Sequence, residues 1–290
     1  MDHGTVYDNS CRSVIDVLRC YGLSLVNAFV LESPELVPAC DLKKIISFLI
    51  ILLVLASPVT VAAANLPNPS TQRKAVILSS LDSIMPMGYY ETYIAAQLTN
   101  AGYSVTFLKD KSVTVNFLVN QLNNYNIVIW RTNTYSWNHA TYYYVGETVN
   151  VATEQKYASD LSQGSLNANA GIFGVTAGFL SNHFKPGTLN HVKLMILISS
   201  DSNIFGPTMI KAGASSVIFC IGLVTLSYGL IDDLTSQLVS YLSSGLNVYT
   251  SVFDTVNPYN NQADLLRDPL DNAYSPPFWF GGSSTLTISQ

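Results

Sequence analysis

The stretch KLMILISSDSNIFGPTMIKAGASSVIFCIG, residues 193–222, decides which fold the chain can adopt. It begins with an apolar run, Lys193 to Ile198, whose length suits a buried parallel strand and is too short for an independent helix. A polar turn follows, then a short helix from Pro207 to Ala212, then a second apolar run. This order predicts a β-turn-α-β unit. Its turn, Ser199 to Ser202, would lie at the carboxyl end of a central strand, where open α/β sheets place their ligands.

The chain before this unit alternates between strand and helix patterns. One helix is expected from Tyr90 to Leu98, and another around an apolar stripe at i, i+3, i+4 and i+7 that starts at Val115. Three strands are expected at residues 74–79, 103–108 and 127–130. Such alternation indicates an α/β fold, a three-layer sandwich with a mostly parallel central sheet.

The alternation breaks between Thr132 and Gly187. This segment is rich in Tyr, Asn, Gly and Thr, and only Ala152 to Leu161 has a helical pattern. We therefore expect an irregular insertion, residues 132–187, of the kind that often forms a binding or active-site region. Further on, the sequence predicts a strand at residues 217–223, a helix that follows Asp232 and Asp233 and ends at Gly245, and an edge strand at residues 284–288.

The amino-terminal part carries an export signal. Lys43 and Lys44 precede an unbroken apolar run, residues 45–56, and a small-residue segment that ends at Ala64. These are the basic, apolar and small-residue regions of a signal peptide.

Because residues 1–41 precede the export signal, two interpretations remain open. Either translation starts at a non-AUG codon for Leu42 and residues 1–41 are a misassigned extension, or residues 45–64 are an uncleaved signal anchor. Both interpretations place the protein outside the cytoplasm, either secreted or anchored in a membrane. Residues 42–64 are then the signal peptide or signal anchor, residues 65–73 a linker, and residues 74–290 a single domain.

The composition excludes several classes of function. The net charge is −5 and only 11% of the residues are charged, so the chain has no basic surface for nucleic acid. Cys220 is the only cysteine after residue 41, so we expect a domain without an internal disulfide. The sequence contains no glycine-rich phosphate-binding motif, zinc-ligand spacing or calcium loop, and we expect no cofactor and no metal.

In the order and local pattern of its elements, the chain resembles the caspase and gingipain-like superfamily of cysteine peptidases. The resemblance depends on Tyr-x-Ile-Val-Ile-x-Arg-Thr in the third strand, Tyr125 to Thr132, on Gly146-Glu147, and on Ala212-Gly213-Ala214 before the fifth strand. It covers residues 74–256 and implies a caspase-like sheet, in which strands are added outward from the fourth and fifth. Another flavodoxin-like domain is the alternative, and the strand order distinguishes the two.

The resemblance implies a catalytic histidine just after the third strand and a catalytic cysteine just after the fourth. Asn133 occupies the first position, and the turn Ser199 to Ser202 occupies the second. An amide has no proton that titrates near neutral pH, so Asn133 cannot replace the histidine as a general base. A substitute arrangement would use Ser200 as nucleophile, His139 as base and Asp201 to orient the base. The alternative is an exposed loop histidine near a turn of capping serines.

Other residues invite a functional interpretation. Cys220 lies in the middle of an apolar strand, where burial makes a thiol inert. Asp82, Asp110 and Asp201 each follow a strand and could hold a divalent cation, although aspartate is also common in tight turns.

Five aromatic residues lie within ten positions, and their rings could form a platform for a peptide or a sugar. The alternative is that alternate rings cover a sheet edge. The five are Tyr135, Trp137, Tyr142, Tyr143 and Tyr144.

These observations together lead us to expect an exported protein of caspase-like fold that lacks an intact peptidase dyad. It would act as an extracellular binding or surface-structural module rather than as an enzyme. Its ligand would be an extracellular peptide, protein or glycan, and it would contact a membrane only through an uncleaved signal anchor. The alternative function is a secreted hydrolase that uses Ser200 with His139.

Overall fold

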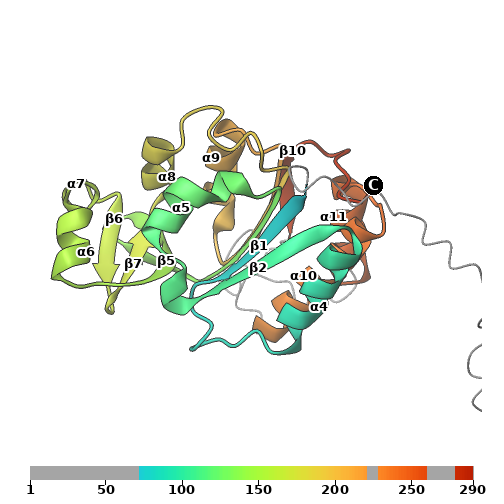
Figure 1. Ribbon diagram of the computed structural model, residues 1–290, viewed down its shortest axis with the longest axis horizontal. Coiled ribbons are helices and arrows are strands. Elements are labelled where there is room, and N and C mark those ends of the chain that lie inside the picture. Colours follow the sequence, from blue (N-terminus) through green and yellow to red (C-terminus); the bar gives the residue numbers. More distant parts are fainter. Residues whose placement is uncertain (1–71, 221–227, 260–277, 290) are drawn as a thin grey trace, which may run out of the picture. The chain divides into compact units, whose positions relative to one another are not determined.

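The computed structural model describes residues 72–220, 228–259 and 278–289, and its centre is a six-stranded sheet between helices (Figure 1). The strand order is β10-β9-β8-β3-β1-β2. The strands are β1 (Arg73–Ser79), β2 (Tyr103–Lys109), β3 (Ile127–Arg131), β8 (Leu194–Ile198), β9 (Ser216–Phe219) and β10 (Trp279–Gly282). The first five are parallel to one another, and β10 pairs with β9 in the antiparallel sense. The expected α/β fold with a mostly parallel central sheet is confirmed.

Helices cover both faces of this sheet (Figure 1). One face carries α4 (Tyr89–Asn100), α10 (Tyr228–Ser243) and α11 (Val248–Val256). The other carries α5 (Val115–Gln121), α8 (Ala177–His183) and α9 (Gly206–Lys211). Short 3-10 turns complete the connections: η2 (Asp110–Ser112), η3 (Leu122–Asn124), η4 (Ser202–Ile204) and η5 (Asn257–Tyr259).

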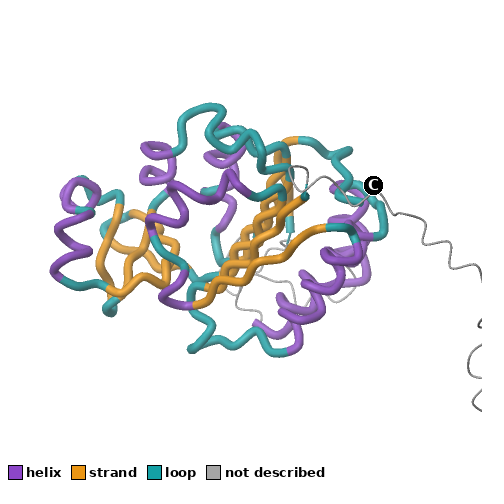
Figure 2. The backbone as a smooth tube through the Cα atoms, in the orientation of Figure 1, coloured by secondary structure: helices purple, strands orange, loops and turns teal. Residues whose placement is uncertain are grey.

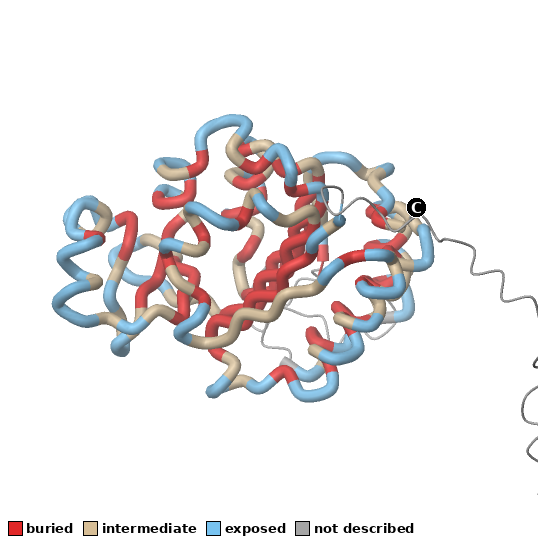
Figure 3. Tube along the Cα trace, in the orientation of Figure 1, coloured by how far each residue is buried: buried red, intermediate tan, exposed pale blue. Residues whose placement is uncertain are grey.

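The apolar strand residues explain why the sheet is covered on both sides. In β3, Val128 and Trp130 pack in one core, and Ile127 and Ile129 in the other. Because successive side chains of a strand point to opposite faces, a continuous apolar run must be buried from both sides. Figure 3 shows the central strands as the largest continuous buried region of the backbone.

A second sheet replaces the irregular insertion expected at residues 132–187 (Figure 2). Its four strands are antiparallel in the order β4-β5-β7-β6. They are β4 (Thr134–Trp137), β5 (Ala140–Thr148), β6 (Leu166–Asn169) and β7 (Ile172–Val175), with α6 (Val151–Lys156) and α7 (Ala158–Ser162) between β5 and β6. The expectation of an irregular segment was therefore wrong, and the single helix expected at 152–161 is two short helices.

Two tight turns define this second sheet. Asn138 and His139, with φ of 48° and 62°, connect β4 to β5, and Ala170 and Gly171, with φ of 50° and 82°, connect β6 to β7. Two-residue hairpin loops with both residues at positive φ match the twist of the strands that they join. Asn-His and Ala-Gly are uncommon choices for such turns, so neither pair indicates a hairpin in the sequence.

The carboxyl-terminal part differs from the expectation in two ways. The last strand is β10 rather than residues 284–288, whose carbonyl groups instead accept hydrogen bonds at the start of α11. Val248 N donates to Leu286 O and Tyr249 N to Ser284 O, both at 3.0 Å. Helix α10 begins at Tyr228, so Asp232 and Asp233 lie beyond its first turn and do not cap it.

Some expectations lie outside the described residues. The export signal and residues 1–41 belong to this group, as do residues 221–223 of the expected fifth strand. Among the described helices, none is both long and apolar enough to cross a membrane.

Candidate functional site

A cleft of about 510 Å³ lies at the carboxyl ends of β1, β2 and β3. One wall comes from residues 80–85 and 110–111, which follow β1 and β2, and the other comes from β5 and β7 of the second sheet. The residues that line it include Leu81, Ser83, Asp110, Lys111, Asn133, Tyr144, Gly146 and Ile172. We call this the switch-point cleft.

The strand order explains why the cleft lies there. The chain passes from β1 to β2 on one side and then returns to β3 on the other side of β1. Where successive connections leave in opposite directions, a crevice opens beyond the carboxyl ends of the strands, and ligands of open α/β sheets bind in it. The sequence predicted a ligand site at the turn after β8, but that turn does not line the cleft.

Asn133, which stands where the resemblance implies a histidine, lines the cleft. Its Oδ1 accepts a hydrogen bond from Thr134 N at 2.8 Å, and its backbone oxygen accepts from Tyr144 N at 3.1 Å. Its Nδ2 makes no hydrogen bond within the described part of the chain. Asn133 therefore offers the cleft an amide donor in a fixed orientation and no general base.

The opposite wall is held together by its own polar contacts. Ser83 donates to Asp110 Oδ1 from its backbone nitrogen at 2.9 Å and from its hydroxyl at 3.0 Å. A Cβ added to Gly146 would lie 1.9 Å from Asp110 O, so only glycine allows β5 to approach η2 this closely. Gly146-Glu147, part of the family resemblance, lies where the pairing of β5 with β7 is irregular. The close contact of Gly146 with Asp110 brings the second sheet against η2.

In the turn after β8, Ser202 has a structural role. Ser202 is fully buried, and its hydroxyl donates to Leu197 O or Cys220 O and accepts a bond from Cys220 N. It therefore fastens the turn to the end of β9. Ser199 is also buried, whereas Ser200 and Asp201 are partly exposed. Asp201 has a φ of 51°, a left-handed conformation that aspartate tolerates better than most residues.

The loops that follow β3 and β8 are neighbours. Thr132 N donates to Ile198 O at 3.0 Å, and Thr134 Oγ1 donates to Ser200 O at 3.1 Å. The positions that the resemblance assigns to the dyad therefore lie close together, on the same edge of the sheet.

His139 lies at the far end of the β4–β5 hairpin from Ser200. It is exposed in the turn between Trp137 and Ala140, whereas Ser200 contacts Thr134 at the start of β4. A four-residue strand spans about 10 Å, so β4 carries His139 away from Ser200. The structure does not bring the three residues of the substitute arrangement together.

The aromatic residues divide between the two faces of the second sheet. The ring of Tyr143 is fully buried in the core beside Trp130, and Tyr142 is 3% exposed. Tyr135 lies over Gly174, with ring centroids 5.1 Å from Tyr142 and 4.5 Å from Tyr144. Burial raises the pKa of Tyr135 well above its ordinary value.

These aromatic rings therefore mostly pack on one another. Trp137 is the most exposed of the five residues at 58%, and Tyr144 is the only one that lines the cleft. On the face that they share, the rings contact one another and leave little open area on which a ligand could stack.

The carboxylates after the strands are used within the protein. Asp82 accepts from Met87 N at 3.3 Å and lies 3.3 Å from Lys109 Nζ, while Asp110 binds Ser83. In residues 72–220, 228–259 and 278–289, no group of three His, Cys, Asp or Glu side chains is arranged to hold a metal. These aspartates act as turn and loop residues.

Cys220 is fully buried, as its apolar neighbours predicted, and it lies directly after the last residue of β9, Phe219. Burial raises the pKa of its thiol to about 12. A thiol with so high a pKa is almost entirely protonated at neutral pH and is a poor nucleophile.

A buried ion pair, which the sequence did not suggest, lies next to the cleft. Arg131 Nε and Nη2 donate to the two carboxylate oxygens of Asp232 at 2.7 and 2.9 Å, and Arg131 Nη1 donates to Met85 O at 2.7 Å. Burial raises the pKa of Asp232 although the guanidinium favours the charged carboxylate. The pair joins β3 to α10 and holds the loop that forms one wall of the cleft.

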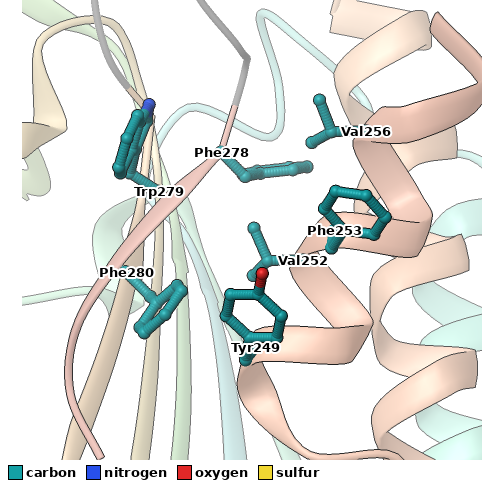
Figure 4. A pocket seen from close by; sticks show the side chains of 7 residues that line it. All are labelled: Tyr249, Val252, Phe253, Val256, Phe278, Trp279 and Phe280. Carbon is teal, nitrogen blue, oxygen red and sulfur yellow. The ribbon is translucent and has the colours of Figure 1, made fainter. Parts of the chain in front are cut away.

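Another hollow, of about 210 Å³, lies between α11 and β10 (Figure 4). It is lined by Tyr249, Val252, Phe253, Val256, Phe278, Trp279 and Phe280. None of the described residues that line it has a charged or amide side chain, so these residues offer few groups that could orient a ligand.

Comparisons with known proteins leave the family open. No family model matches the chain, and no curated protein matches it. Among solved structures, the Drosophila initiator caspase Dronc is 8% identical with a TM-score of 0.36, over 74% of this chain and 82% of that chain. The DNA/pantothenate metabolism flavoprotein from Streptococcus pneumoniae is 14% identical with a TM-score of 0.27, over 53% and 83%. Likenesses this distant carry no argument about activity.

Proposed function

We propose that this protein is an exported binding module of caspase-like fold without an intact peptidase dyad, and that its ligand lies in the switch-point cleft. The observation that carries the proposal is the cleft itself, with the Asn133 amide at the position where the peptidase family has its base. An amide at this position can donate a hydrogen bond to a ligand, but it cannot take a proton from a nucleophile as the histidine of the peptidase family does.

The strand order supports the caspase-like part of the proposal. Five parallel strands in the order 2-1-3-4-5 are common to flavodoxin-like sheets. Here a sixth strand, β10, extends the sheet outward beyond the fifth, β9, and runs antiparallel to it. An outward extension beyond the fourth and fifth strands is what the resemblance implied.

The character of the cleft supports an extracellular peptide, protein or glycan as its ligand. Its walls combine aliphatic groups, such as Leu81 and Ile172, with a few polar groups. The polar groups include the amide of Asn133, the carboxylate of Asp110 and the ammonium group of Lys111. An apolar site with a few oriented polar groups is typical of specific ligand binding.

A cleavage assay tests the non-enzymatic part of the proposal. The purified protein is incubated with a broad peptide library, and we expect no cleavage above that in buffer alone. Robust cleavage that is abolished by Ser200→Ala or His139→Ala would rule the proposal out and establish the hydrolase alternative.

A binding screen tests the role of the cleft. Phage-displayed peptides and an array of extracellular glycans are presented to the immobilised protein and to the variant Asn133→Ala. We expect enriched ligands that bind the variant at least tenfold more weakly, with Trp137→Ala as a control for an exposed residue outside the cleft. Ligands that bind Asn133→Ala as well as they bind the unaltered protein would exclude the cleft as the binding site.

Amino-terminal sequencing of the protein recovered from culture medium and from membranes tests the proposed export. We expect a processed chain in the medium that begins within residues 62–70, or an intact chain in the membrane fraction. Recovery of the protein only from the cytoplasm would refute export.

A further inference from the structure

Helices α4 and α10 lie side by side on one face of the central sheet (Figure 1). A groove of about 260 Å³ runs between their outer surfaces. Residues of both helices line it, and none of them lines the switch-point cleft. The groove is a separate site that the proposed function does not use.

The α4 side of the groove presents two aromatic rings. Tyr89 and Tyr93 are 71% and 42% exposed, well above the exposure of a packed tyrosine. They are four positions apart on the helix, so their side chains are neighbours, with Cβ atoms about 6 Å apart. Tyr241 of α10 lines the other side of the groove. Tyrosine offers a broad apolar ring and a hydroxyl group at low entropic cost, which makes it a frequent contact residue.

The α10 side of the groove presents hydrogen-bonding groups. The hydroxyl of Tyr89 donates to Asp233, and Gln237 Nε2 donates to the Tyr241 hydroxyl at 3.1 Å. These contacts leave Gln237 Oε1 as an acceptor and the proton of the Tyr241 hydroxyl as a donor. Tyrosine, carboxylate and amide are thus held in a fixed arrangement along the groove.

The charge of the groove limits the ligand further. Among the described residues that line it, Asp233 is the single charged one, and none is Lys, Arg or His. A phosphate, sulfate or carboxylate ligand would find no cation to pair with. A purely apolar ligand would leave the hydroxyl, amide and carboxylate groups unsatisfied.

We propose that the α4–α10 groove binds a neutral carbohydrate. A sugar ring has an apolar C–H face that packs on an aromatic ring, and a periphery of hydroxyl groups that both donate and accept hydrogen bonds. These properties match Tyr89 and Tyr93 on one side and Asp233, Gln237 and Tyr241 on the other. A proline-rich peptide, another occupant of tyrosine-lined grooves, has no N–H at its prolines and would leave the acceptors unmatched.

Affinity gel electrophoresis tests this proposal. The purified protein is run in native gels that contain increasing amounts of a soluble glucan, mannan, galactan or xylan. We expect at least one of these polysaccharides to retard it. Tyr93→Ala and Gln237→Ala should each raise the apparent Kd for that polysaccharide at least tenfold, because they remove a stacking ring and a hydrogen-bonding amide. Tyr93→Phe should retain most of the binding.

Tyr249→Ala is the matched control, since Tyr249 is 56% exposed but lies on α11, outside the groove. Thermal denaturation establishes that each variant is folded; if one is not, the other variant decides. No retardation by any of the four polysaccharides would overturn the proposal. So would equal retardation of the Tyr93→Ala and Gln237→Ala variants, or binding of a proline-rich peptide that the same substitutions abolish.

Discussion

The two sheets of this protein reach stability by different means. In the six-stranded sheet, the apolar runs of β1, β3, β8 and β9 are buried on both faces, and a buried ion pair between Arg131 and Asp232 ties the carboxyl end of β3 to α10. The four-stranded sheet has one face in the core and one that carries tyrosines and asparagines, and tight turns and a glycine contact hold it in place. A buried parallel sheet depends on the removal of apolar surface from water, whereas a small antiparallel sheet depends on local geometry.

The largest expected difference between the two regions is in chemical protection. With Cys11, Cys20 and Cys40 replaced by serine, Cys220 remains as a probe of the main sheet. Because burial raises the pKa of its thiol to about 12, we expect a thiol reagent at pH 8 to modify the folded protein on the order of 1,000-fold more slowly than the unfolded protein. Absorbance after addition of Ellman's reagent measures both rates.

The same shift predicts a pH dependence. The unfolded thiol loses its proton near pH 9 and the folded one near pH 12, so the unfolded state binds fewer protons between these values. The contribution of this thiol to stability is therefore complete below about pH 9 and is lost as the pH rises toward 12. Fast labelling of folded protein at pH 8 would show that the end of β9 is open to water.

The second largest effect is expected at the ion pair that ties the main sheet to α10. Asp232→Ala leaves the guanidinium of Arg131 buried without its carboxylate, and we expect the free energy of unfolding to fall by about 3–5 kcal/mol. Asp233→Ala, at the exposed neighbouring position, should cost about 0.5 kcal/mol or less. Urea denaturation measures both. Equal losses in the two variants would mean that the pair does not stabilise the main sheet.

A smaller loss is expected where the two sheets meet. Gly146→Ala places a methyl group against Asp110 O, a backbone atom that cannot rotate away, so we expect a loss of about 1–3 kcal/mol. Gly178→Ala is a suitable control, because the added methyl group there would have its nearest contact at 3.4 Å. If Gly146→Ala is as stable as Gly178→Ala in urea denaturation, the second sheet is not fixed to η2 in this way.

The smallest effect concerns the turn of the second sheet, and it is a gain. His139 has a φ of 62°, which costs an ordinary residue about 1 kcal/mol relative to glycine. His139→Gly should therefore raise the stability of the protein by about that amount and shift the thermal midpoint upward. The same substitution should leave ligand binding in the switch-point cleft unchanged. A loss of stability would give the His139 side chain a role that the hairpin does not explain.

The sequence predicted the main sheet well because its strands carry their own signal. Val128, Ile129 and Trp130 are buried whichever face they point to, so an uninterrupted apolar run was enough to identify β3. The second sheet was missed because its strands mix tyrosine, asparagine and glycine, and because its turns use Asn138-His139 and Ala170-Gly171. Aromatic pairs such as Tyr135 and Tyr142 become visible only once the strands are aligned.

The candidate site was predicted in part. The adjacency of the loops after β3 and β8 followed from the parallel sheet, since the carboxyl ends of parallel strands share an edge. The position of the cleft at β1 and β3 depends on the order of strands, which a linear sequence does not display. Two further features depend on tertiary packing. Arg131 pairs with Asp232, and Ser200 and His139 lie at opposite ends of the β4–β5 hairpin.

Arg73, the first residue of β1, donates a hydrogen bond to Ile288 O at 3.0 Å, and the Tyr103 hydroxyl donates to the same oxygen at 3.1 Å. The first and the last of the described residues are thus held together at one place, at the amino ends of β1 and β2. The switch-point cleft opens at the other ends, about 20 Å away along β1. A tether attached through residue 72 would therefore join the protein at the amino ends of the strands. The switch-point cleft, at the carboxyl ends, would remain accessible to a ligand.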